Sequence, residues 1–159
     1  LAHYMPWFQY DARKRKGGWH WTMGRPGPLE AEGPVAAHLT PLIGPYESKD
    51  RSVIRYHLAL MQECGIRGVV INWYGTRLAK DFPLNLEASD AIVEECAAAG
   101  MLFTVCYEDW TVVDVPTETG PSAESLASGK AQLKKDFEYL RDRYMSRPGF
   151  LRASGESRS

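Results

Sequence analysis

Aromatic residues occur in four short segments of this sequence, and polar side chains accompany them in three of the four. Three of them follow apolar stretches of strand length, and they are Pro6-Trp7-Phe8, Asn72-Trp73-Tyr74-Gly75 and Tyr107-Glu108-Asp109-Trp110. The fourth, Trp19-His20-Trp21, lies in a long polar stretch. Tryptophan and tyrosine offer flat apolar area with a polar handle, which suits the C–H faces of a sugar, while carboxylates, His and Asn bind hydroxyls. This combination, with no basic cluster beside it, favours a neutral carbohydrate ligand over a phosphate ester.

Glu108 is the only glutamate at the end of an expected strand, and it is the candidate catalytic residue. Cleavage of a glycosidic bond usually requires two carboxyl groups, one that protonates the leaving oxygen and one that acts as nucleophile or base. Asp109 is adjacent in the chain and would point the opposite way along a continued strand, so these two do not form that pair. The second carboxylate has to come from elsewhere. The alternative role for Glu108 is a hydrogen-bond acceptor for a loop.

Composition and motif spacing argue against several other functions. The 19 Lys and Arg are balanced by 20 Asp and Glu, so the chain has no basic surplus for nucleic acid, and the basic run at 13–16 is expected to be a solvated loop. No apolar run approaches the ~20 residues of a membrane span. The sequence contains no C-x-x-C, no His pair with metal-ligand spacing and no Gly-x-Ser-x-Gly motif. We therefore expect no nucleic-acid or membrane partner, no metal and no other cofactor.

The apolar pattern alternates between strand-length runs and helical stripes. Strands are expected within the segment 1–8, ending near Pro6-Trp7, and over 68–73 and 101–107. Helices are expected to follow the caps Asp50, Asn85 and Ser122 or Ser125, with stops at Gly65, Gly100 and Arg147-Pro148. The expected core stripe of the third helix is Leu126, Lys130, Leu133, Phe137, Leu140 and Tyr144. The residues expected to be core or semi-buried are His57, Cys64, Cys96 and Cys106.

This alternation, with strands that are apolar on both faces, indicates an α/β fold with a parallel sheet. A doubly wound nucleotide-binding sheet should carry a Gly-rich turn after its first strand, and residues 8–15 contain no glycine. We therefore predict a (β/α)8 TIM-barrel fold represented by about its first three β/α units, because a complete barrel takes ~250 residues. Residues 1–150 are assigned to this partial barrel domain. Residues 151–159 form a divergent polar tail that indicates truncation or a change of frame.

Four segments, in order and at suitable spacing, resemble glycoside hydrolase family 99 (GH99), the endo-α-mannosidase family, and the broader family 71/99-like group. Residues 3–8, His-Tyr-Met-Pro-Trp-Phe, resemble its Tyr-Tyr-Pro-Trp-Tyr opening, with Met5 in place of an aromatic residue, and Trp19-His20-Trp21 resembles its Trp/His loop motif. Residues 41–50 are similar to its Gly-Pro-Tyr-(Ser/Asp)-Ser-x-Asp segment, and residues 65–75 to its second strand, which ends in Trp-Tyr. The resemblance covers about residues 1–110.

The resemblance implies a barrel that binds and cleaves a glycan, which is an α-mannoside in the best-known members. It implies that Tyr4, Trp7, Tyr46 and Trp73 line or support the sugar subsites. Glu108 lies two positions beyond the family's acidic residue near the end of the third strand. The family's catalytic acids lie in a Glu-Trp-His-Glu-like motif late in the barrel, which this sequence lacks, so we expect the main catalytic pair outside this chain and no turnover by the chain alone.

The resemblance also favours a secreted or extracytoplasmic location. This chain shows no signal peptide, and it opens at Leu1 inside an expected strand, which indicates a processed or trimmed product.

The expected partner is a glycan. The substrate-binding candidates are Tyr4, Trp7, Trp19, His20, Trp21, Tyr46, Asn72, Trp73, Tyr74 and Asp109. Open sheet edges in a partial barrel also predict self-association. Two alternatives remain, a non-catalytic carbohydrate-binding protein and a small scaffolding α/β domain whose aromatic residues serve packing.

Overall fold

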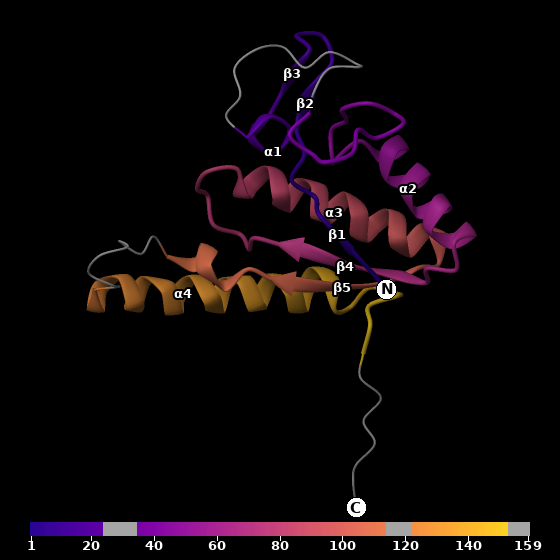
Figure 1. Ribbon diagram of the computed structural model, residues 1–159. Coiled ribbons are helices and arrows are strands. Elements are labelled where there is room, and N and C mark those ends of the chain that lie inside the picture. The colour runs from indigo at the N-terminus through magenta and orange to yellow at the C-terminus, as the bar shows by residue number, and fades with distance from the viewer. Residues whose placement is uncertain (24–34, 114–121, 153–159) are drawn as a thin grey trace, which may run out of the picture.

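The centre of the chain is a three-stranded parallel sheet, seen in a computed structural model that describes residues 1–23, 35–113 and 122–152 (Figure 1). The strands are β1 (Ala2–Tyr4), β4 (Gly68–Trp73) and β5 (Leu102–Tyr107), in the order β1-β4-β5. All three predicted strands are therefore present. β1 ends at Tyr4, slightly before the predicted end near Pro6-Trp7, where the chain turns.

Helices cover one face of this sheet. α2 (Arg51–Glu63) connects β1 to β4, α3 (Phe82–Ala99) connects β4 to β5, and α4 (Ala123–Tyr139) follows β5 and continues as the π-helical turn η2 (Leu140–Tyr144). Right-handed crossovers place successive helices on the same face when the strand order advances in one direction. One buried cluster confirms this, and from the sheet and the three helices it includes Ile71, Trp73, Phe103, Ile54, Leu58, Ile92, Leu140 and Tyr144.

The opposite face of the sheet is open. His3, Val70 and Thr104 are aligned across the three strands, and their side chains are exposed or half-buried. In a (β/α)8 barrel this is the inner face, which the remaining strands enclose. A doubly wound sheet would instead reverse its strand order and carry helices on both faces. The predicted fold class, a partial TIM-type barrel, is confirmed.

The chain returns to the sheet after α4. Phe150 forms a parallel bridge with Phe103, with hydrogen bonds from the Phe103 amide to the Gly149 carbonyl (2.9 Å) and from the Leu151 amide to the Phe103 carbonyl (2.8 Å). This is the position of a fourth barrel strand, on the far side of β5. Of the predicted polar tail, residues 153–159 lie outside the described residues.

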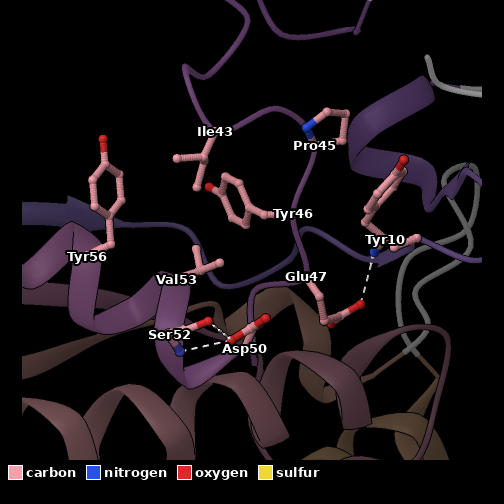
Figure 2. Close-up of a pocket in the computed structure, with 10 residues that line it drawn as sticks. Tyr10, Ile43, Pro45, Tyr46, Glu47, Asp50, Ser52, Val53 and Tyr56 are labelled. Carbon is pink, nitrogen blue, oxygen red and sulfur yellow. Dashed lines mark hydrogen bonds between the residues drawn. The ribbon is translucent and has the colours of Figure 1, made fainter. Parts of the chain in front are cut away.

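Most of the predicted helix ends are confirmed. The Asp50 carboxylate accepts from the Ser52 amide (2.8 Å) at the start of α2 (Figure 2), and the Ser122 hydroxyl accepts from the Ser125 amide (3.0 Å) at the start of α4. Gly65 and Gly100 follow α2 and α3 with φ of 74° and 65°, the left-handed conformation in which glycine is unstrained.

The predicted start of α3 is wrong. The helix begins at Phe82, and Asn85 lies inside it, 1% exposed. The Asn85 side chain accepts from the Tyr74 amide (3.1 Å) and donates to the Asn72 carbonyl (3.1 Å). Asn85 therefore ties α3 to the end of β4 instead of capping a helix.

The predicted core stripe of α4 is wrong over most of its length. Leu126, Leu133 and Phe137 are 50%, 36% and 52% exposed, and Lys130 is also exposed. Gly129 and Asp136 are the buried residues of α4. At Gly129 the helix lies close against the Val113 side chain, because a Cβ at this position would be 2.6 Å from it. Periodicity locates an apolar face but does not say which neighbour covers it. Leu140 and Tyr144, in η2, are buried as predicted.

The long polar stretch before α2 contains regular structure that the sequence did not predict. β2 (Tyr10–Asp11) and β3 (Lys16–Gly17) form an antiparallel hairpin, followed by the one-turn helix α1 (Trp19–Thr22). The basic run at 13–16 is exposed, as predicted. Residues 24–34 lie outside the described residues.

The core predictions for histidine and cysteine hold in part. His57 is half-buried, with the Tyr4 hydroxyl 2.8 Å from its Nδ1, and Cys96 is buried. Cys64 is exposed, because it ends α2 at the surface. Cys106 is only half-buried, because it lies on the open face aligned with Asn72. Among the described residues, no helix is both long and apolar enough to cross a bilayer.

Ion pairs join α2 to α3 through Glu95. Its carboxylate accepts from Arg55 Nε (2.7 Å) and Nη2 (3.0 Å) and from Arg51 Nη1 (3.0 Å). Hydrogen bonding to Arg55 is the main cause that lowers the pKa of Glu95 below its ordinary value, and bonding to Arg51 adds to it. Glu94 pairs with Arg51 and is more exposed, with 40% of its side chain accessible against 7% for Glu95.

We predict that Glu95→Gln lowers the melting temperature at pH 7 and that this deficit shrinks on acidification. A carboxylate whose folded pKa is depressed stabilises the fold above its unfolded pKa, near 4.5, and that contribution is lost as the pH falls through the folded value. Thermal unfolding followed by circular dichroism between pH 7 and pH 3 measures this. Glu94→Gln is the matched control and should change little, because exposed pairs contribute little. Equal deficits for both variants, or a deficit that is constant with pH, would contradict the prediction.

Candidate functional site

A cavity of about 550 Å³ lies where the loops after the three strands meet. Its lining residues are Gln9, Trp19, His20, Tyr74, Lys80, Asp81, Phe82 and Trp110. The first three follow β1, the next four follow β4 and begin α3, and Trp110 follows β5 in the short 3-10 helix η1 (Asp109–Val112). The carboxyl ends of parallel strands are where barrel enzymes place their active sites.

Two tryptophans that line this cavity, Trp19 and Trp110, are 62% and 53% exposed. Between them Tyr74 is 6% exposed, with its ring 5.3 Å from Phe82 and 5.8 Å from Trp110 in edge-to-face geometry. Rings fixed by such contacts present stable apolar faces to a ligand. Lys80 Nζ lies 5.6 Å from the centre of the Trp110 ring, over the same cluster.

A histidine–aspartate pair supplies the polar part of the cavity. His20 Nε2 lies 3.3 Å from Asp81 Oδ2, and the imidazole stacks on Trp7 with ring centres 4.6 Å apart and planes inclined by 8°. Burial lowers the pKa of His20 below 6.5, and the charge and hydrogen bond of Asp81 only partly oppose this. The imidazole is therefore mostly neutral at pH 7 and is oriented by Asp81 and Trp7.

Glu108 lies beside the cavity rather than in its lining. One carboxylate oxygen accepts from the Asn72 side-chain amide, and the other accepts from the Trp110 indole (2.8 Å). Each oxygen keeps a second lone pair that can accept a ligand hydroxyl. Within the described residues Asn72 Oδ1 is buried and has no hydrogen-bond partner. Asp109, the neighbour of Glu108, is exposed.

Three of the predicted site residues are packing residues in this structure. Tyr4 is buried against His57, and Trp73 is fully buried among Tyr107, Tyr139 and Tyr144. Trp21 is 1% exposed and donates its indole N–H to the Tyr46 carbonyl (2.9 Å). None of the three is among the residues that line the cavity.

Tyr46 lines a separate hollow of about 390 Å³ above the start of α2, which shares no residue with the first cavity. Figure 2 shows its ring beside Ile43, above Val53, with Tyr56 on the neighbouring turn of α2. Burial raises the pKa of Tyr46 to about 12, so its hydroxyl remains protonated at neutral pH.

The structure adds cavity residues that the sequence candidates lack. Gln9, Lys80, Asp81 and Phe82 come from the long chain after β1 and from the loop after β4. A signal for the last three existed, because residues 76–84 connect a predicted strand to a predicted helix on the site side of a barrel. No periodicity or motif distinguishes them within that loop. Among the described residues, no three His, Cys, Asp or Glu side chains are grouped closely enough to hold a metal ion.

The fold has clear counterparts among solved structures. The GH99 endo-alpha-mannosidase from Bacteroides thetaiotaomicron aligns with a TM-score of 0.63 and 18% sequence identity, over 96% of this chain and 41% of that chain. The fold is that of part of a GH99 enzyme. A second structure, the GH99 endo-alpha-mannosidase in complex with BIS-TRIS-Propane, aligns with a TM-score of 0.62 and 18% identity, over 96% of this chain and 38% of that one. No protein-family model matches the chain, and no characterised protein matches it in sequence.

The chain thus spans about two fifths of the length of the GH99 enzyme whose fold it shares. The structural likeness supports the resemblance noted in the sequence at the level of the fold.

We predict that Asp81→Asn lowers the pKa of His20 further. Asp81 is the group that favours the charged imidazole, so its removal leaves the effect of burial unopposed. Titration of the imidazole carbon-bound protons by NMR measures the value. Asp109→Asn is the control, since it removes an exposed carboxylate at the end of β5 that makes no such contact. A rise in the His20 pKa in Asp81→Asn would refute this electrostatic account.

Proposed function

We propose that this chain is the sugar-binding part of a glycoside hydrolase-type barrel and that the 550 Å³ cavity binds a neutral sugar unit. The observation that carries the proposal is the convergence of three strand-end loops that present the exposed faces of Trp19 and Trp110 beside polar groups. Apolar rings for the C–H faces and carboxylates for the hydroxyls form the lining that a carbohydrate requires. The shared fold with a GH99 enzyme supports a carbohydrate-active protein.

We infer that the natural substrate class is an α-mannoside-type glycan. This rests on the GH99-like segments in the sequence and on the likeness of the fold to that of a GH99 endo-alpha-mannosidase. Glu108 is assigned to a sugar hydroxyl or to one of the two carboxyl roles in glycoside cleavage. Asp81, which lines the cavity, is paired with His20. We infer that the second carboxyl group for cleavage is supplied from outside this chain. The chain alone therefore binds without turnover.

We predict that Trp110→Ala and Trp19→Ala each weaken the binding of α-mannobiose by about fivefold, because each removes an aromatic face worth roughly 1 kcal/mol. Isothermal titration calorimetry gives the affinity, with cellobiose as the comparison sugar. Phe137→Ala is the matched control, because Phe137 is similarly exposed, at 52%, but lies on α4 outside the cavity. Saturable binding that is unchanged in both tryptophan variants would move the sugar site elsewhere. No binding of either sugar by the unaltered chain would favour the scaffolding alternative.

We predict that Glu108→Gln also weakens α-mannobiose binding, by about tenfold, because the loss of hydrogen bonds to a charged acceptor costs roughly that much. The amide that replaces one oxygen cannot accept from Asn72 or Trp110. Thermal unfolding should accompany the binding measurement. Glu124→Gln, on the exposed first turn of α4, serves as a charge-matched control. Full affinity in Glu108→Gln would leave Glu108 as a structural acceptor for the loop.

A further inference from the structure

The loop after β4 contributes Tyr74, Lys80, Asp81 and Phe82 to the cavity, which is half of the lining. Its path is held from outside the cavity by Asp136 on α4. Asp136 is 1% exposed and is not a lining residue. It lies 60 positions after the loop residue Thr76 that it contacts.

The Asp136 carboxylate accepts hydrogen bonds from the β4 loop, from β5 and from α4. Oδ1 accepts from the Thr76 backbone amide (2.7 Å), the Thr76 hydroxyl (2.7 Å) and the Gln132 side-chain amide (2.9 Å). Oδ2 accepts from the Tyr107 hydroxyl (2.5 Å). Gln132 also donates to the Thr76 hydroxyl oxygen (3.0 Å). The carboxylate therefore connects the β4 loop, the end of β5 and α4.

The loop backbone is shaped to this carboxylate at Gly75. Gly75 has φ of +82°, and a Cβ at that position would lie 2.6 Å from Asp136 Oδ2. Tyr74 and Thr76 flank this contact, and Tyr74 is the buried ring on which Trp110 and Phe82 pack. A displacement of Thr76 therefore moves the aromatic floor of the cavity.

All of these donors are uncharged. A buried carboxylate is costly to desolvate, and hydrogen bonds to a charged acceptor are stronger than those between neutral groups. The neighbouring apolar residues Leu133 and Phe137 of α4 are 36% and 52% exposed, whereas Asp136 and Gly129 are the buried residues of the helix. The Asp136 side chain therefore holds the loop through hydrogen bonds and does not pack in an apolar core.

We propose that Asp136 is a positioning residue for the sugar cavity: through Thr76 and Gly75 it fixes the β4 loop, and so the placement of Tyr74 and Phe82 against Trp110. This rests on the proposed function of the cavity. Asp136 acts without touching the ligand.

The test compares two variants that each remove one hydroxyl donor from the same carboxylate. Thr76→Val removes the hydroxyl donor of the loop. Tyr107→Phe removes the hydroxyl donor of β5 and keeps both hydrogen bonds from Thr76, one from its backbone amide and one from its hydroxyl. We expect Thr76→Val to weaken α-mannobiose binding by about tenfold, as for the loss of one charge-assisted hydrogen bond. Tyr107→Phe should lower the melting temperature while leaving the affinity unchanged. Equal losses of affinity in the two variants, or none in either, would overturn the positioning role.

A second readout needs no ligand and separates this inference from the proposed function. The Trp110 indole signal in a ¹H–¹⁵N spectrum should shift in Thr76→Val and stay in place in Tyr107→Phe, with Trp21, buried in the other aromatic cluster, as internal reference. An unmoved Trp110 signal in Thr76→Val overturns the inference whether or not sugar binds. If the signal shifts in a chain that binds no sugar, the positioning role of Asp136 is supported and only the proposed function is refuted.

Discussion

The right-handed connection between parallel strands is the constraint on which this structure depends. Because β1, β4 and β5 follow one another in a single direction across the sheet, their connecting helices all lie on one face. The strand ends then open toward the same edge, and the loops that follow them meet there. Residues as far apart as Gln9, Tyr74 and Trp110 line one cavity for this reason.

Polar contacts hold the strand end and the loop that shape that cavity. Asn85 holds the end of β4 through the oxygen and the nitrogen of its side-chain amide. Asp136 holds the loop that follows, and Asp81 faces His20 in the cavity. Polar groups removed from water are stable only when their partners are in place, so such contacts select one loop path among many of similar packing energy. The aromatic rings are then held in fixed orientations.

The open face of the sheet and the strand position beside β5 are those expected of a partial barrel. His3, Val70 and Thr104 line what is the inner wall of a complete barrel, and Phe150 occupies the place of the next strand beside β5. The described residues match about two fifths of a GH99 structure. We propose that this partial barrel binds a sugar at its strand-end edge, whereas cleavage needs a second carboxyl group on the opposite side of the substrate.

The sequence by itself determined the α/β class, the three strands, the helix caps at Asp50 and Ser122 and the stops at Gly65 and Gly100, because these depend on periodicity and on local backbone preferences. It also located the strand ends that carry Glu108 and Tyr74. Only the tertiary structure decided which aromatic residues became core and which became surface. Trp73 is buried while Trp110 is exposed, since strand facing and loop path differ for residues of the same type. The roles of Asn85 and Asp136 were likewise decided by partners many residues away, which no local pattern encodes.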